Sequence, residues 1–177
     1  MKWYLRPLIP ISLAMFVATL IYISGPDYYI PLLAVVTTFF GAVGTGSVSC
    51  LFVGRALRVN SLVLILLVAF MESDMSLFVT LNYDFILKIP LLGKLLNRYE
   101  GMARKLLEKK KFVEGLELYT IFILMFIPWY GTGAITMSLV GRILSLEWKK
   151  VWATISLASL IRTALIVSLL YLGLLIQ

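Results

Sequence analysis

The chain consists of long apolar segments with few charges between them, and this feature constrains its fold more than any other. Of its 177 residues, 61% are apolar and 14% are charged, and the mean hydropathy is +0.98. Soluble domains carry about 25% charged residues. The sequence therefore excludes a soluble globule, a disordered chain and a disulfide scaffold, and it predicts one all-α integral membrane domain over residues 1–177.

The residue types that most enzymes and metal sites use are scarce. The chain has no histidine, which is the commonest metal ligand and the usual general base near neutral pH. Its one cysteine, Cys50, has no second cysteine for a disulfide or a cysteine-rich metal site, so we expect it to pack as a small apolar residue. The sequence also shows no nucleophile–base pair. We therefore expect no enzyme, no metal and no cofactor.

An internal repeat relates two of the apolar segments. Residues 44–57 read GTGSVSCLFVGRAL and residues 131–144 read GTGAITMSLVGRIL, at a constant offset of 87 and with seven of fourteen pairs identical. Apolar composition does not explain a shared G-T-G that is followed eight residues later by G-R. Each copy precedes a long apolar segment, so repeat one covers 28–80 and repeat two covers 117–176. Glycine-interrupted segments in two matching halves are typical of a transporter binding site.

Two geometries fit each broken segment. As one helix, residues 28–54 would be about 40 Å long and ample to span a membrane. As a hairpin with G-T-G at its tip, the arms 29–43 and 47–57 would be about 22 and 16 Å long. Such arms are too short for the ~30 Å hydrocarbon core, so the hairpin would enter and leave on one side.

The distribution of charge favours the hairpins. Single spans would divide the Lys and Arg residues seven against eight between the two sides, whereas hairpins divide them thirteen against two, with Arg162 inside the membrane. The positive-inside rule then places the N-terminus in the cytoplasm. The predicted order is a first transmembrane helix at 8–24, repeat one, a cytoplasmic amphipathic linker at 84–115, and repeat two. One crossing per repeat makes the two copies inverted, with re-entrant hairpin tips that meet near the midplane.

The two G-T-G motifs form the first candidate site. Glycine permits the positive φ and the close backbone approach that a tip needs. The helices that follow would aim their N-termini at the midplane, which suits an anion such as phosphate. In the alternative interpretation, the glycines form a tight helix-packing interface. The aromatic residues before the second tip would line a cavity or anchor the chain at the membrane interface. The residues of this site are Gly44, Thr45, Gly46, Gly131, Thr132 and Gly133 at the tips, and Pro128, Trp129 and Tyr130 before the second tip.

Three charged residues lie deep in the predicted spanning helices. Glu72 and Asp74 are in the first, and Arg162 is in the second. Intramembrane charges are costly and indicate an ion or proton path. The two acids lie about 200° apart around a helix, so we expect only one to face a cavity. The repeat alignment sets Met75 against Arg162, which predicts an ion pair of Arg162 with Asp74 or Glu72; a purely structural pair is the alternative.

The remaining basic residues point to lipid contacts. Arg55 and Arg142 end the predicted hairpins, where they would reach the headgroups or hold a substrate phosphate. Apolar residues three and four apart in 91–107, with lysines and arginines between them, predict an amphipathic helix on the cytoplasmic leaflet. We expect the segment 91–111 to attract anionic lipid headgroups and not nucleic acid. A homodimer is left open.

The stretch FIPWYGTGAITMSLVGR resembles the family of putative small multidrug export proteins of bacteria and archaea, which is distantly similar to the DedA/VTT membrane proteins. The resemblance covers residues 84–144 and centres on a P-x-x-G-T-G-A signature from Pro128 to Ala134. Trp129 and Tyr130 replace the middle of the usual Pro-Leu-Pro-Gly, and the first half lacks an E-x-R-x-x-I-P-like element. The resemblance implies a multi-pass protein of the prokaryotic inner membrane that moves a small molecule or lipid. Glu72, Asp74 and Arg162 resemble in kind the acids and arginines beside the hairpins of DedA relatives, although no motif carries them over.

Two functional hypotheses follow. The first is a transporter or flippase of a small amphiphile, either an anionic lipid phosphate or a drug-like compound. Proton coupling and a midplane site between the G-T-G tips belong to this hypothesis. The second is a non-transporting structural or assembly protein of the membrane. The repeat and the intramembrane charges favour the first.

Overall fold

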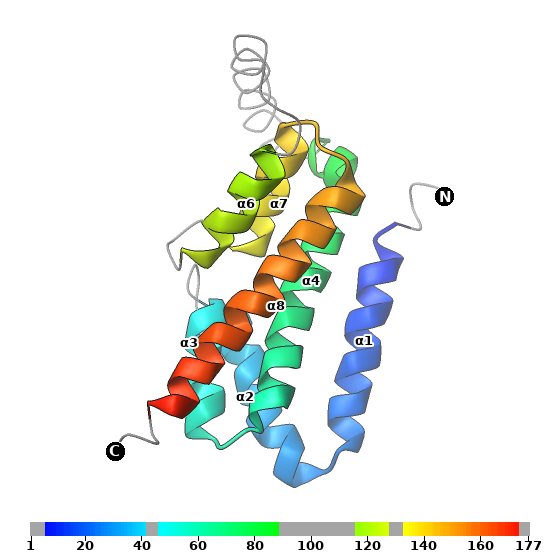
Figure 1. Ribbon diagram of the computed structural model, residues 1–177. Coiled ribbons are helices and arrows are strands. Elements are labelled where there is room, and N and C mark those ends of the chain that lie inside the picture. The colour runs from blue at the N-terminus through cyan, green and yellow to red at the C-terminus, as the bar shows by residue number, and fades with distance from the viewer. Residues whose placement is uncertain (1–5, 42–45, 89–115, 128–132, 174–177) are drawn as a thin grey trace.

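The computed structural model describes residues 6–41, 46–88, 116–127 and 133–173, and these ranges are built from α-helices without strands. The predicted all-α class is therefore confirmed for this part of the chain. Residues 89–115 of the predicted linker and most of both G-T-G motifs lie outside it. The helices, labelled in Figure 1, are α1 (Leu8–Ile23), α2 (Pro26–Gly41), α3 (Gly46–Ala56), α4 (Ser61–Ile86), α6 (Leu116–Phe126), α7 (Ala134–Ile143) and α8 (Trp148–Leu172).

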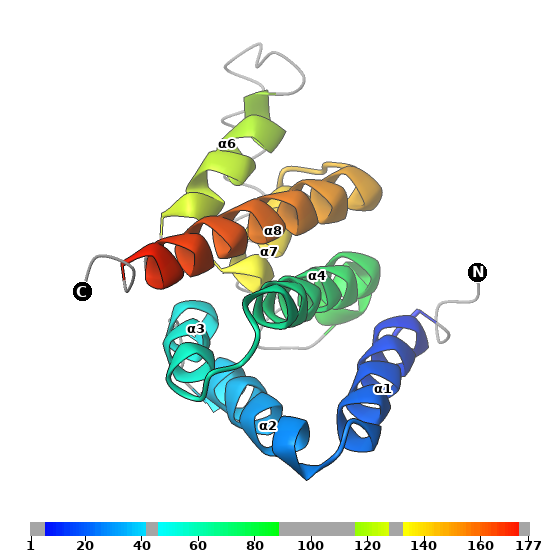
Figure 2. The same cartoon turned by 60° about the horizontal axis from the view of Figure 1, so that its bottom comes forward.

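Two long helices, α4 and α8, form the centre of the fold and run in opposite directions side by side (Figures 1 and 2). They have 26 and 25 residues and are apolar enough to cross a membrane. At about 1.5 Å per residue each exceeds the ~30 Å hydrocarbon core. α4 continues to Ile86, beyond the predicted segment end at residue 80. The antiparallel arrangement brings the Tyr171 hydroxyl near the end of α8 to the Val59 carbonyl oxygen before α4, to which it donates a hydrogen bond.

Each broken apolar segment forms a pair of helices. α2 ends at Gly41 and α3 begins at Gly46, and the two pack against each other, so the alternative of one helix over 28–54 is wrong. α6 and α7 form the second pair, which has shorter arms. With 10 to 16 residues, the arms are about 15–24 Å long. The two pairs lie at opposite ends of the central α4 and α8 (Figure 1).

The two turns that lead into α4 and α8 are also related by the offset of 87 residues. Arg58 and Ser145, 87 residues apart, both adopt the left-handed conformation, with φ of 57° and 61°. The Val59 N–H donates to the Gly54 carbonyl at 2.9 Å, and the Leu146 N–H donates to the Gly141 carbonyl at 3.1 Å. This six-residue bond closes a helix C-terminus in the same way in both halves. The two halves therefore share turn geometry as well as sequence.

The glycine of each G-R pair lets a short helix approach a long one closely. A Cβ atom on Gly54 would lie 2.4 Å from a methyl group of Leu64 in α4. A Cβ atom on Gly141 would lie 2.7 and 2.8 Å from the two methyl groups of Val151 in α8. Sequence comparison identified these glycines as repeat identities without assigning them a role. The structure shows that they set the spacing of α3 on α4 and of α7 on α8.

The first helix, α1, matches the predicted segment 8–24 closely but is short. Its 16 residues span about 24 Å, less than the hydrocarbon core, so its length alone does not make it a membrane span. Arg6, just before α1, bonds through Nη1 to Asp84 Oδ2 near the end of α4 at 3.2 Å. Figures 1 and 2 both place α4 between α8 and α1, so α4 has one side toward each.

Candidate functional site

A buried ion pair joins the two central helices midway along their length. Arg162 of α8 bonds through Nη2 to Oε1 of Glu72 of α4. The two side chains are only 5% and 2% exposed. Of the two acids that the sequence offered as partners, the structure selects Glu72. Removing both charges from water is costly, and their mutual attraction offsets this cost only when further hydrogen bonds satisfy the remaining polar atoms.

Two further hydrogen bonds of Arg162 reach the helix pairs at both ends of the fold. Its Nη1 donates to the Met125 carbonyl oxygen in the last turn of α6 at 2.9 Å. The last carbonyl groups of a helix lack partners within the helix and carry partial negative charge, so a cation is favourable there. Its Nη2 donates to Ser47 Oγ in the first turn of α3 at 3.3 Å. One guanidinium group therefore connects the inner ends of α6 and α3. Residue type gave no signal for Met125, because its backbone makes the contact.

The second carboxylate oxygen of Glu72 is also bonded. Oε2 accepts a hydrogen bond from the Ser159 hydroxyl of α8. Ser159 is the repeat equivalent of Glu72, at the offset of 87. Nearby, the Ser138 hydroxyl of α7 donates to the Ser76 hydroxyl of α4 at 2.8 Å, and both residues are fully buried. We call Glu72, Arg162, Ser159, Ser47 and the Met125 carbonyl the polar junction. Sequence reasoning missed the serines, although the repeat alignment could have flagged Ser159.

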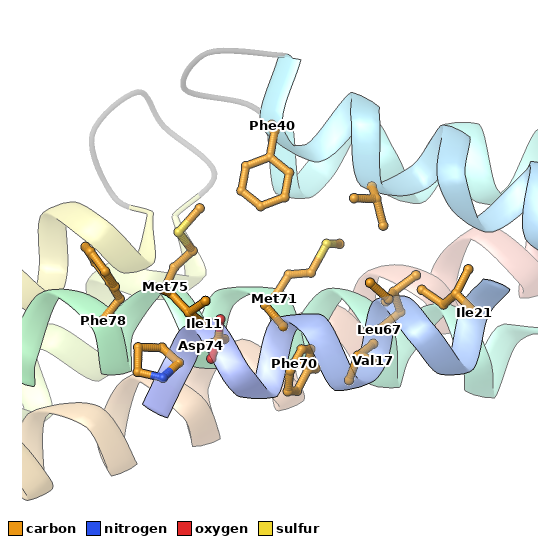
Figure 3. Close-up of a pocket in the computed structure, with 14 residues that line it drawn as sticks. Ile11, Val17, Ile21, Phe40, Leu67, Phe70, Met71, Asp74, Met75 and Phe78 are labelled. Carbon is orange, nitrogen blue, oxygen red and sulfur yellow. The ribbon is translucent and has the colours of Figure 1, made fainter. Parts of the chain in front are cut away.

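Asp74 lies on a different side of α4 from the polar junction. Two residues correspond to about 200° around a helix, so its side chain points away from Arg162. It lines a pocket of about 330 Å³ formed by α1, α2 and α4 (Figure 3). Its Oδ1 atom is buried and has no hydrogen-bond partner among the residues that the structure describes. The structure thus separates the two acids into different environments.

The structure describes the G-T-G motifs only at their edges. Gly46 is the first residue of α3, and Gly133 caps the start of α7. A tip glycine is expected to have a positive φ. This expectation is wrong at Gly133, where φ is −72° and ψ is 168°. That conformation is extended and open to any residue. A Cβ atom there would meet no described atom within 4 Å. The other predicted tip residues fall in the ranges 42–45 and 128–132, outside the described residues.

The arginines near the ends of α3 and α7 pack on tyrosine rings of the central helices α8 and α4. The Arg55 guanidinium lies 4.0 Å from the ring centre of Tyr171 in α8, and that of Arg142 lies 5.2 Å from the ring centre of Tyr83 in α4. Such contacts are favourable cation–π interactions. Arg142 Nη1 also donates to the Leu146 carbonyl oxygen at 2.9 Å. Contact with a headgroup or phosphate remains a prediction for both arginines.

Comparison with known proteins identifies one family. Residues 41–165 match the model of a family described as putative small multi-drug export protein. The matched range contains the whole polar junction and begins at the last residue of α2, so α1 lies outside it. No curated protein and no solved structure matches the chain.

Proposed function

Because this chain belongs to the family of putative small multi-drug export proteins, we propose that it is a membrane transporter of small amphiphiles with its site at the polar junction. One observation carries the proposal. A buried guanidinium group midway along α8 connects the ion pair to the inner ends of both broken segments. Charges at this depth are expensive, and they typically mark a substrate or ion path.

The junction suggests how transport is gated. While Arg162 holds Glu72, the Met125 carbonyl and Ser47, the four helices α3, α4, α6 and α8 are tied at one point. A proton on Glu72 removes the negative partner, and the anionic group of a lipid phosphate or drug-like compound then takes its place on Arg162. Because the substrate anion replaces the Glu72 carboxylate, the buried Arg162 guanidinium is not left without a negative partner. The helix pairs are then free to move on either side of the site.

The proposed topology is an inverted repeat of two re-entrant hairpins in the prokaryotic inner membrane, with the N-terminus in the cytoplasm. The position of the helix pairs at opposite ends of α4 and α8 supports it (Figure 1). The arms of 10 to 16 residues, too short to span, also support it. The charge distribution of thirteen against two fits the same orientation. The segment 91–111, Arg55 and Arg142 then serve as contacts for anionic lipid.

The matched turn residues Arg58 and Ser145 test this topology. In a Cys50→Ala background, we expect cysteine at position 58 to react with an impermeant maleimide on right-side-out vesicles. Cysteine at position 145 should react only after permeabilisation, because the inverted arrangement puts the two equivalent turns on opposite sides. Both positions are exposed in the protein, and the background without cysteine is the control. Labelling of both from the same side would exclude the inverted arrangement.

Transport itself is tested with the purified protein in liposomes that carry a pH gradient. The exchange at Arg162 predicts that the gradient accelerates movement of a fluorescent polyprenyl phosphate; a fluorescent lipophilic cation is assayed in parallel. The Glu72→Gln variant keeps the side-chain shape but cannot carry the proton, so the acceleration by the pH gradient should be lost. Asp84→Asn, an exposed acid on the same helix, is the matched control. Probe movement no faster than in empty liposomes would contradict the proposal.

A structural or assembly role is the second candidate. The complete bonding and burial of the ion pair favour it. Both oxygens of Glu72 are bonded and the pair is almost fully excluded from solvent. Such a pair also serves as a permanent clamp between α4 and α8. If the pair is only a clamp, Glu72→Gln should change the stability of the protein, and neither the variant nor the unmodified protein should move the probe. The liposome assay therefore separates the two candidates.

A further inference from the structure

The pocket beside α1 is distinct from the polar junction and contains one charged residue. Its volume of about 330 Å³ falls at the lower end of the ~300–1,000 Å³ typical of small-molecule sites. The described residues that line it are apolar except for Asp74. Figure 3 shows Met71 and Met75 reaching from α4 toward the space below Phe40 of α2, with Asp74 beside Ile11 of α1. The pocket therefore combines adaptable apolar walls with a single carboxylate.

Asp74 is in none of the ion pairs found among the described residues. Arg162 bonds to Glu72 on a different side of α4. Arg6 bonds to Asp84, ten residues further along α4 and thus about 15 Å away along the helix axis. Asp74 Oδ1 is nevertheless buried and lacks a hydrogen-bond partner among the described residues. A buried polar atom without a partner is costly, so a ligand that supplies the partner would bind with a clear advantage.

The other walls of the pocket suit an organic cation. Phe40, Phe70 and Phe78 line it, and aromatic faces attract cations. Met71 and Met75 are unbranched and polarizable, which lets them adapt to ligands of different shape. We propose that the space between α1, α2 and α4 is a binding site for lipophilic monocations, such as aryl or alkyl ammonium and phosphonium ions, with the positive charge at Asp74.

This inference rests on the proposed function only where it makes the bound cation a transported substrate. Binding at Asp74 is a separate claim, because the polar junction and the pocket share no residue. Binding is therefore measured without any gradient. Binding of a cation that the protein does not move would leave the site intact and count against transport. Transport of the phosphate probe without cation binding would support the proposed function and count against the site at Asp74.

The experiment measures equilibrium binding of tetraphenylphosphonium to the full chain in phosphatidylcholine nanodiscs. We expect saturable binding that Asp74→Asn weakens by about tenfold or more, which corresponds to about 1.4 kcal/mol. Asp84→Asn, which removes an acid of the same helix outside the pocket, should bind like the unmodified protein. Triphenylphosphine oxide has a similar aromatic shape but no positive charge, so it should compete only weakly.

A second variant keeps the test decisive if Asp74→Asn fails to fold. Ala18 of α1 is exposed and lines the pocket, so Ala18→Phe fills the space from the other side while Asp74 is retained. We expect it to lower tetraphenylphosphonium affinity to a similar extent. Unchanged affinity in Ala18→Phe and in a folded Asp74→Asn would overturn the proposal. Equal competition by the neutral triphenylphosphine oxide would also overturn it, because the pocket would then be only an apolar cleft without preference for a cation.

Discussion

Replacing Arg162 with leucine is expected to lower the free energy of unfolding by about 3–5 kcal/mol, because it leaves the Glu72 carboxylate buried without its cation. The substitution also removes the donor to the Met125 carbonyl and to Ser47, so α6 and α3 lose their connection to α8. Glu72→Leu should cost a similar amount, since it leaves the guanidinium buried without its anion. The measurement is thermal or denaturant unfolding of the purified protein in detergent.

The double variant Glu72→Leu/Arg162→Leu should be milder than the sum of the two single variants. Replacement of a whole buried ion pair by apolar residues is often close to neutral, whereas loss of one partner is not. The exposed pair Arg6–Asp84 is the matched control, with side chains 37% and 67% exposed, and its removal should cost about 0–1 kcal/mol. Strictly additive effects at positions 72 and 162 would mean that the two side chains do not act as a pair.

Substitution of Gly141 is expected to have the next largest effect. Gly141→Ala places a methyl group against both methyl groups of Val151, which is fully buried and has a β-branched, stiff side chain. Overpacking of this kind costs about 1–3 kcal/mol, and Gly141→Leu should exceed it. Gly54→Ala should be milder, because the nearest atom is the end of the more flexible Leu64 side chain. Unfolding in detergent measures all three.

A rescue experiment identifies the cause of the Gly141 effect. Val151→Ala removes the methyl groups that a Cβ atom on Gly141 would meet, so it should recover part of the loss in Gly141→Ala. Gly41→Ala at the end of α2 is the control, since no described atom lies within 4 Å of its Cβ position, and it should be nearly neutral. If Gly141→Ala were no worse than Gly41→Ala, close packing of α7 on α8 would not explain why glycine stands there.

Residue type and spacing predicted much of this molecule. Low charge and high hydropathy indicated an all-α membrane protein, and the family match agrees. The P-x-x-G-T-G-A signature pointed to the same family. The offset of 87 located the two halves, and the same offset relates the starts of α4 and α8 at Ser61 and Trp148. Helix formation and helix ends depend on neighbouring residues, and the repeat is found by comparing residue types, so none of these features requires the tertiary structure.

What the sequence by itself determined was therefore the class, the repeat and the depth at which Glu72 and Arg162 meet. Only the tertiary structure decided that Arg162 takes Glu72 rather than Asp74, and that Asp74 opens onto a pocket with α1. The physical reason is that pairing depends on the rotation of α4 about its axis. Contacts with α8 and α1, segments far away in the chain, set that rotation. The sequence could not predict the bond from Arg162 to the Met125 carbonyl either, because every residue has a backbone carbonyl. This one can accept the bond because it lies in the last turn of α6, where carbonyl groups lack partners within the helix.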